Sequence, residues 1–92
     1  MNTNTQNKYL TSTLGYGMLR AIVKYYKPDD EIKKRAEFYL DKSQPLTEKL
    51  WWKKTEGSFF SNVLDGNVYG AISRGDQSLR KAICQALIEN EI

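Results

Sequence analysis

The 92-residue chain contains no histidine and only one cysteine, Cys84. Histidine is the side chain whose charge changes near neutral pH, and a cysteine nucleophile needs a base beside it. Without that base, we expect Cys84 to pack as a small apolar side chain in the last helix. The composition argues against acid–base, nucleophilic and metal chemistry. We therefore expect a protein that is not an enzyme, with no catalytic residue, no cofactor and no metal.

Long apolar runs and disulfide pairs are missing as well. No stretch approaches the roughly 18 consecutive apolar residues of a membrane-spanning helix. A single cysteine cannot form an internal disulfide, and the polar opening of the chain lacks the basic and apolar pattern of a secretory signal. These absences predict a protein of the reducing cytoplasm that does not enter a membrane.

The residues that are present favour one small folded domain. Apolar residues make up 40% of the chain and aromatic residues 12%, more than a disordered protein contains. We expect a disordered tail over residues 1–8 and a single helical domain over residues 9–92. The predicted fold class is all-α, a small bundle of four to five short helices.

Helical spacing and capping residues locate most of these helices. The first follows the N-cap residues at positions 11–13 and ends before Pro28, which begins the second. A third helix runs from Pro45 to about Gly57, and Asp76 caps the last one. The residues expected on the buried faces of the first, second and last helix recur at helical spacing: Leu14, Met18, Ile22 and Tyr25; Ile32, Ala36, Tyr39 and Leu40; Leu79, Ile83, Ala86 and Leu87.

Residues 58–72 allow two interpretations. Asp65-Gly66 between two apolar runs is a hairpin signal, which would make the fold α+β. Strict alternation is absent, however, and the pairs Phe59-Phe60 and Val63-Leu64 are separated by about four residues, as in a helix. We therefore favour two short helices, with Gly66 closing the turn between them.

The run from Gly57 to Asp76 contains a Gly-Ser-Phe start, a Val-Leu pair, a short polar turn, an apolar residue followed three positions later by Ala71, and an aspartate that opens the last helix. With Leu79 and Ile83 beyond it, this run resembles a pattern common in small phage and prophage accessory proteins. The resemblance covers roughly a third of the chain and implies the helical interpretation. Because its elements are caps and core positions, it implies no catalytic or binding residue. It also implies that the expected cytoplasm is that of a bacterial host cell.

Positive charge gathers in the middle of the chain. Residues 20–54 contain ten basic and six acidic residues, an excess of four, whereas the whole chain carries only +3. Within this region we expect Phe38 to lie exposed in a basic stripe. If Trp51 joins Leu50 in the core, Trp52 should point at least partly outward, because adjacent helix residues cannot share a face. The candidate partner-binding residues are Arg20, Lys24, Lys27, Lys33, Lys34, Phe38, Lys42, Trp52, Lys53 and Lys54.

Simpler interpretations of the same residues stand beside this one. Both tryptophans could pack at the edge of a small core, with the neighbouring lysines as a solvated rim. The basic residues could form ordinary helix-surface pairs, such as Arg35 with Glu31, because most charged runs are solvated faces. In either case the region would stabilise the fold and bind nothing.

A chain without catalytic side chains has to act by contact. The mixed basic and aromatic surface favours a non-enzymatic interaction protein that binds and blocks a larger host protein or RNA–protein complex. The most concrete such protein is an inhibitor of bacterial defence of the anti-CRISPR type, whose basic residues would meet acidic side chains or nucleic-acid phosphates. The alternative is a small nucleic-acid-binding regulator that uses a basic helical face.

Overall fold

The computed structural model describes residues 10–27 and 30–89, and within those residues it contains six α-helices and no strand. The helices are α2 (Thr13–Tyr25), α3 (Asp30–Leu40), α4 (Leu46–Thr55), α5 (Ser58–Leu64), α6 (Val68–Arg74) and α7 (Gln77–Glu89). The expected all-α class is confirmed, with one helix more than the four to five expected. The expected tail over residues 1–8 lies outside the described residues, as does Pro28, the expected start of the second helix.

Within the described residues, side-chain caps begin helices α2, α6 and α7. Ser12 caps α2 by accepting a hydrogen bond from the backbone N–H three residues later, at 3.1 Å. Asn67 caps α6 in the same way at 3.1 Å. The Asp76 carboxylate caps α7 with a bond of 2.9 Å. Each bond satisfies a donor that the helix cannot pair internally, and the predicted cap at Asp76 is confirmed.

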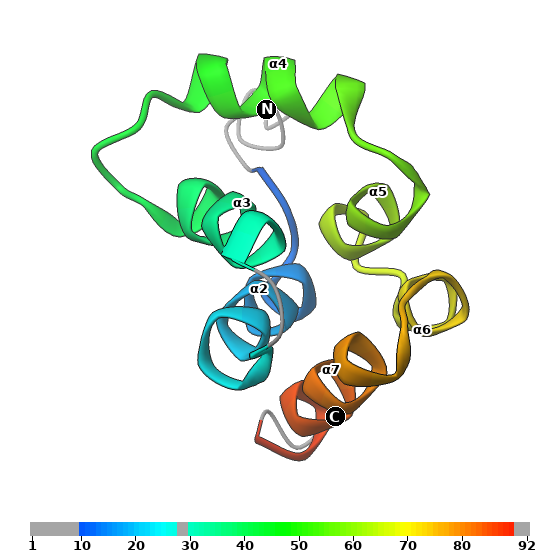
Figure 1. Cartoon of the computed structure of the whole chain (residues 1–92). Helices are drawn as coiled ribbons and strands as arrows, with labels where there is room; N and C mark the ends of the chain where they lie inside the picture. The colour runs from blue at the N-terminus through cyan, green and yellow to red at the C-terminus, as the bar shows by residue number, and fades with distance from the viewer. Residues whose placement is uncertain (1–9, 28–29, 90–92) are drawn as a thin grey trace.

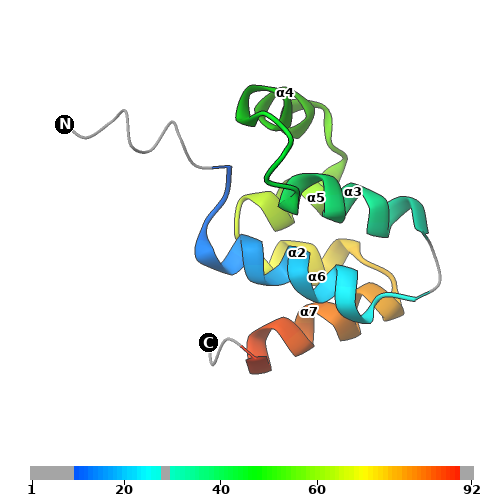
Figure 2. The ribbon, with the colours of Figure 1, turned by 90° about the vertical axis from the view of Figure 1, so that its left-hand side faces the viewer.

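Helix α2 is the centre of the fold. It packs against α3, α5 and α7, and α3 and α7 run alongside it on opposite sides (Figure 2). Met18, Leu19 and Ile22 are fully buried, so more than one side of α2 is enclosed. The other large buried side chains of the core are Leu10, Tyr26, Tyr39, Phe60, Val63, Leu64, Leu79 and Ile83. Removing this apolar surface from water is the main contribution that stabilises the bundle.

Gly15 allows the chain before α2 to approach the helix closely. The Thr11 hydroxyl donates a hydrogen bond to the carbonyl oxygen of Leu64 at 2.5 Å, which ties the entry to α2 to the end of α5. A Cβ atom at position 15 would lie 1.9 Å from that hydroxyl oxygen. A larger residue would therefore displace Thr11, so this glycine has a packing role in addition to the weaker first turn that it causes.

Residues 58–72 form the two short helices α5 and α6, and the hairpin alternative is wrong. The connection depends on Gly66, which has φ +74°, in the left-handed region that favours glycine. The Gly66 N–H donates to the Val63 carbonyl oxygen at 3.0 Å. Asp65-Gly66 therefore closes a helix in this protein, as a C-terminal glycine commonly does.

Helix α4 lies across one end of the bundle, while α2, α3 and α7 run alongside one another (Figure 1). It packs against α5, and the residue that follows it, Glu56, contacts α3. Pro45 is its N-cap, in agreement with the break predicted there. The opposite side of α4 is open to solvent and carries its exposed side chains: Thr47, Glu48, Trp51, Trp52, Lys54 and Thr55.

Candidate interaction surface on helix α4

Helix α4 departs from the usual order of side chains at Lys49 and at its two tryptophans. Trp51 is 57% exposed and Trp52 40%, whereas Lys49 is only 9% exposed. Leu46 and Leu50 are half-buried and pack against the core. A lysine can occupy an inner position because its methylene groups pack on apolar side chains while the amine reaches a polar group or water. Trp51 therefore does not join Leu50 on the core side of α4, and both tryptophans face outward.

The two indoles form an outward-facing pair. The ring centroids of Trp51 and Trp52 are 5.0 Å apart and the ring planes meet at 89°, an edge-to-face arrangement. Trp52 also lines a hollow of about 260 Å³ together with Arg35 and Phe38 of α3. The exposed face of α4 thus presents aromatic surface with a cationic side chain at its border.

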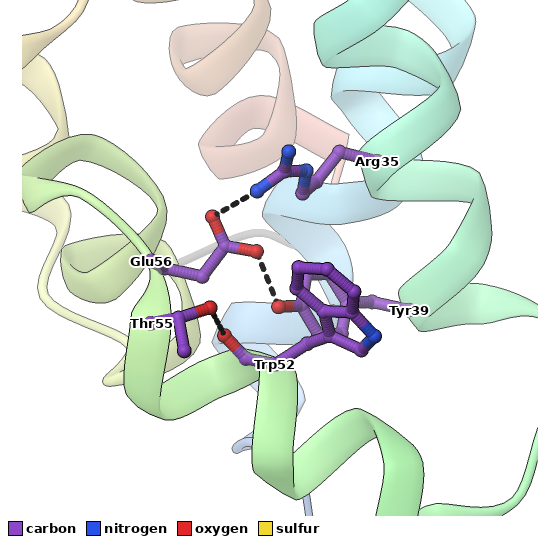
Figure 3. Close-up of polar contacts among 5 residues, drawn as sticks. All are labelled: Arg35, Tyr39, Trp52, Thr55 and Glu56. Atoms are coloured by element: carbon purple, nitrogen blue, oxygen red, sulfur yellow. Dashed lines mark hydrogen bonds and ion pairs between the residues drawn. The ribbon is translucent and has the colours of Figure 1, made fainter.

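A polar clamp of Arg35, Tyr39 and Glu56 holds the end of α4 against α3 (Figure 3). The Glu56 side chain is 2% exposed and forms an ion pair with the Arg35 guanidinium at 2.8 Å. The same carboxylate accepts a hydrogen bond from the Tyr39 hydroxyl. In the last turn of α4, the Thr55 hydroxyl donates to the Trp52 carbonyl oxygen at 2.8 Å. These contacts fix where α4 ends, and with it the direction in which Trp52 points.

The Tyr39 hydroxyl is kept protonated by its surroundings. Burial of the ring is the largest cause that raises the pKa of Tyr39 above its ordinary value, and the Glu56 carboxylate adds to it. The Arg35 charge acts in the opposite direction with a smaller effect. The phenol therefore remains a hydrogen-bond donor throughout the physiological pH range.

Two of the predicted partner-binding lysines are engaged within the protein. The Lys53 amine donates to the Leu10 carbonyl oxygen at 2.9 Å, which attaches α4 to the chain before α2. Lys24 forms an ion pair with Glu89 of α7 at 3.5 Å, and the Tyr25 hydroxyl donates to the same carboxylate. Both lysines therefore contribute to packing between segments, which the sequence pattern did not indicate.

Phe38 is also placed differently from the prediction. It is half-buried against the core, and its ring meets the edge of Tyr39 at a centroid distance of 5.2 Å and an angle of 66°. The expectation of an exposed aromatic in a basic stripe is therefore wrong. Only part of the ring is available, at the hollow that it shares with Trp52.

Two predicted basic residues meet a third that sequence analysis missed. Arg20 and Lys42 line a hollow of about 480 Å³ together with Lys49, and the rest of its lining is Tyr16, Tyr39 and Leu40. Of the other basic candidates outside this hollow, Lys33 is half-buried, and the rest are exposed: Lys27, Lys34 and Lys54. Lys49 lies three residues after Leu46, and this spacing, which places it near that apolar residue on the helix surface, is the signal that could have found it.

No protein-family model, curated protein or solved structure matches the chain. The described residues contain no group of three or more potential metal ligands. Among the described helices, none is long and apolar enough to cross a membrane. Cys84 is exposed, so the expectation that it packs as an apolar side chain is wrong.

Proposed function

We propose that the protein is a non-enzymatic inhibitor that binds a larger host protein or RNA–protein complex through α4 and blocks it, in the manner of an anti-CRISPR protein. The observation that carries the proposal is the outward-facing pair of Trp51 and Trp52. Exposing two large aromatic side chains while Lys49 is buried gives up apolar burial that folding could use. Such side chains are best accounted for by a partner that covers them.

The surroundings of the indoles suggest the chemistry of that partner. Arg35 borders the hollow beside Trp52 and is 40% exposed despite its ion pair with Glu56. Lys54 is exposed on the same face of α4 as Trp51. Tryptophan and arginine are enriched at the centres of interfaces, and charges at the rim steer an oppositely charged partner. A partner with an apolar pocket bordered by carboxylates or phosphates fits this surface.

Inhibition of this kind requires no chemistry from the protein itself. A standard interface covers roughly 800 Å² on each partner, an area that a small domain can supply. Covering a surface that the host assembly needs for binding or moving nucleic acid is sufficient to block it. The exposed Lys27 and Lys34 would then contribute to the rate of association more than to the strength of the complex.

The test compares the double variant Trp51→Ala/Trp52→Ala with Tyr69→Ala. Tyr69 on α6 is 86% exposed, so its removal is a matched loss of exposed aromatic surface away from α4. Tagged proteins are incubated with bacterial lysate, with and without nuclease, and captured proteins are identified by mass spectrometry. We expect the parent and Tyr69→Ala to capture the same host protein or complex. The double variant should lose capture at least about tenfold, because buried tryptophans are typical binding hot spots.

Equal capture by the double variant would contradict the proposal. Recovery of nucleic acid without protein would favour the competing function, a small regulator that binds nucleic acid through a basic helical face, and its binding would weaken steeply with salt. Inhibition is tested in cells that carry a CRISPR system. There the parent should raise the plaquing efficiency of a targeted phage, and the double variant should not.

A further inference from the structure

Lys49 is a nearly buried cation without a hydrogen bond or a close ion pair in the described part of the chain. It is 9% exposed, and its amine makes no hydrogen bond or ion pair with residues 10–27 or 30–89. Among those residues, no fully enclosed side-chain nitrogen or oxygen atom lacks a partner, so the Lys49 amine is not fully enclosed, and the residue lines a hollow. A cation in such a position is costly unless water or an anion meets it there.

Two further cations line the same hollow. Arg20 comes from α2, Lys42 from the connection between α3 and α4, and Lys49 from α4 itself. No carboxylate lies among the described lining residues, and none of the three cations makes an ion pair within the described segments. Three separate parts of the fold therefore bring positive charge to one concave place.

We propose that this hollow binds the phosphate group of a nucleotide-sized phosphate monoester. Its volume of about 480 Å³ lies within the range of small-molecule sites. A phosphate monoester carries roughly −1.5 to −2 charge at neutral pH and offers three acceptor oxygens, which suits three cationic donors. Arg20 can bind two of those oxygens at once, whereas the two lysines act as point charges.

The apolar part of the lining accounts for a ligand larger than phosphate alone. Tyr16 and Leu40 are half-buried and border the cations. Tyr39 forms a fully buried part of the wall, and its hydroxyl is committed to Glu56. An aromatic and an aliphatic side chain next to a phosphate site suit a nucleobase or a similar ring. The site stands apart from the function proposed above, because it uses the inner side of α4 and not its indoles.

One acid outside the lining, Asp41, is close enough to interact with Lys49. Its carboxylate accepts hydrogen bonds from the Ser43 backbone N–H at 2.9 Å and from the Ser43 hydroxyl at 2.7 Å. These hydrogen bonds, and to a smaller extent the Lys49 charge, lower the pKa of Asp41. The carboxylate is therefore ionised at neutral pH, and it opposes an anion in the hollow. Asp41→Asn should tighten binding of phosphate.

The experiment measures binding of adenosine monophosphate, inorganic phosphate and adenosine to the full chain by calorimetry, with amide chemical shifts to locate the site. We expect adenosine monophosphate to bind most tightly, phosphate more weakly and adenosine not measurably. Lys49→Met keeps most of the side-chain volume and should weaken binding at least tenfold. Lys81→Met removes the same charge from an exposed position on α7 and should leave affinity within about twofold.

Lys42→Gln, at an exposed position, tests the site independently of any effect of Lys49→Met on folding, and it should also weaken binding. Three results would overturn the proposal. The first is that both phosphate ligands bind with a Kd weaker than about 1 mM, and the second is that adenosine binds as tightly as its monophosphate. The third is that Lys42→Gln and a folded Lys49→Met both bind with the affinity of the parent. If adenosine monophosphate binds no more tightly than inorganic phosphate, the claim that the ligand is nucleotide-sized is wrong.

Discussion

Helices α7 and α4 differ in how far their apolar side chains face the core, because α4 buries Leu46 and Leu50 only in part and exposes both tryptophans. In α7, Leu79 and Ile83 are buried and Lys81 lies outside, the order expected of a helix on an apolar core. In α4, Lys49 is buried and Trp51 lies outside. Helix α4 does not lack large apolar residues, because its tryptophans are present on the other side. Folding alone accounts for the face of α7, whereas the exposed tryptophans of α4 are the side chains that the proposed partner would cover.

The two helices also differ in how they are attached. Helix α7 packs along the central α2, and apolar side chains meet between them. Helix α4 packs on the short α5 and is held to α3 by the clamp of Arg35, Tyr39 and Glu56. Apolar burial stabilises in proportion to area, whereas a polar clamp depends on a few directional contacts. A single substitution should therefore disturb α4 while the rest of the bundle stays folded.

The largest effect is expected on the apolar side of α7. Ile83→Ala removes a fully buried side chain and should lower the free energy of unfolding by roughly 2–5 kcal/mol. Leu50→Ala, at a half-buried position on α4, should cost less than half as much. Urea unfolding followed by circular dichroism measures both losses. Equal losses would contradict the distinction between the two helices.

The clamp should give the next largest effect. Glu56→Ala leaves the buried Tyr39 hydroxyl without its acceptor and Arg35 without its counter-ion, at a cost of roughly 1.5–3 kcal/mol. The loss should stay below that of a fully buried ion pair, because Arg35 is 40% exposed and water can solvate it. Amide spectra should change at α3 and α4 more than at α7. Unchanged stability and spectra would show that the clamp does not hold α4.

Two identical substitutions on α4 should have different effects. Lys53→Met removes the donor to the Leu10 carbonyl oxygen and should cost about 1 kcal/mol. Lys49→Met loses no described hydrogen bond and replaces a buried charge with an apolar group, so stability should stay within about 0.5 kcal/mol or rise. Urea unfolding of both variants makes the comparison. A larger loss for Lys49→Met would mean that its amine stabilises the fold.

The smallest effect concerns the contact between α2 and the end of α7. The hydrogen bond from Tyr25, and then the Lys24 charge, lower the pKa of Glu89. Because the pKa of Glu89 is lower in the folded protein than in the unfolded chain, the contact stabilises the fold above the ordinary glutamate pKa near 4.3. This stabilisation is lost as the pH falls through the pKa that Glu89 has in the folded protein. The melting temperature of the parent should fall more steeply than that of Glu89→Gln below about pH 4. Parallel curves would show that the contact does not affect stability.

Local signals explain why most of the helices could be predicted. A cap at Asp76 and a left-handed glycine at Gly66 act within a few residues of their own helix. The interpretation of residues 58–72 as two short helices is therefore confirmed. The orientation of α4 could not be predicted in this way. It is decided by contacts between residues that are far apart in the sequence. Arg35 and Glu56 are separated by 21 positions, and Lys53 and Leu10 by 43.

The candidate site shows the same limit. Leu50, Trp51 and Trp52 are adjacent, so helical spacing alone does not show which of them faces the core. Phe38 is half-buried because its ring packs against Tyr39 and the core, and this packing does not follow from the spacing of lysines. Of the basic residues predicted to bind a partner, Arg20 and Lys42 line the hollow together with Lys49, which was not among the predicted residues.

The most direct test of the contrast between α7 and α4 is the free energy of unfolding of Trp51→Ala, measured with urea and circular dichroism. Trp51 is 57% exposed and packs edge-to-face on Trp52, so its removal should cost less than about 1 kcal/mol. A loss of roughly 3–5 kcal/mol, which is typical for a tryptophan in a core, would contradict the account. It would show that Trp51 stabilises the fold and is not held outward for a partner.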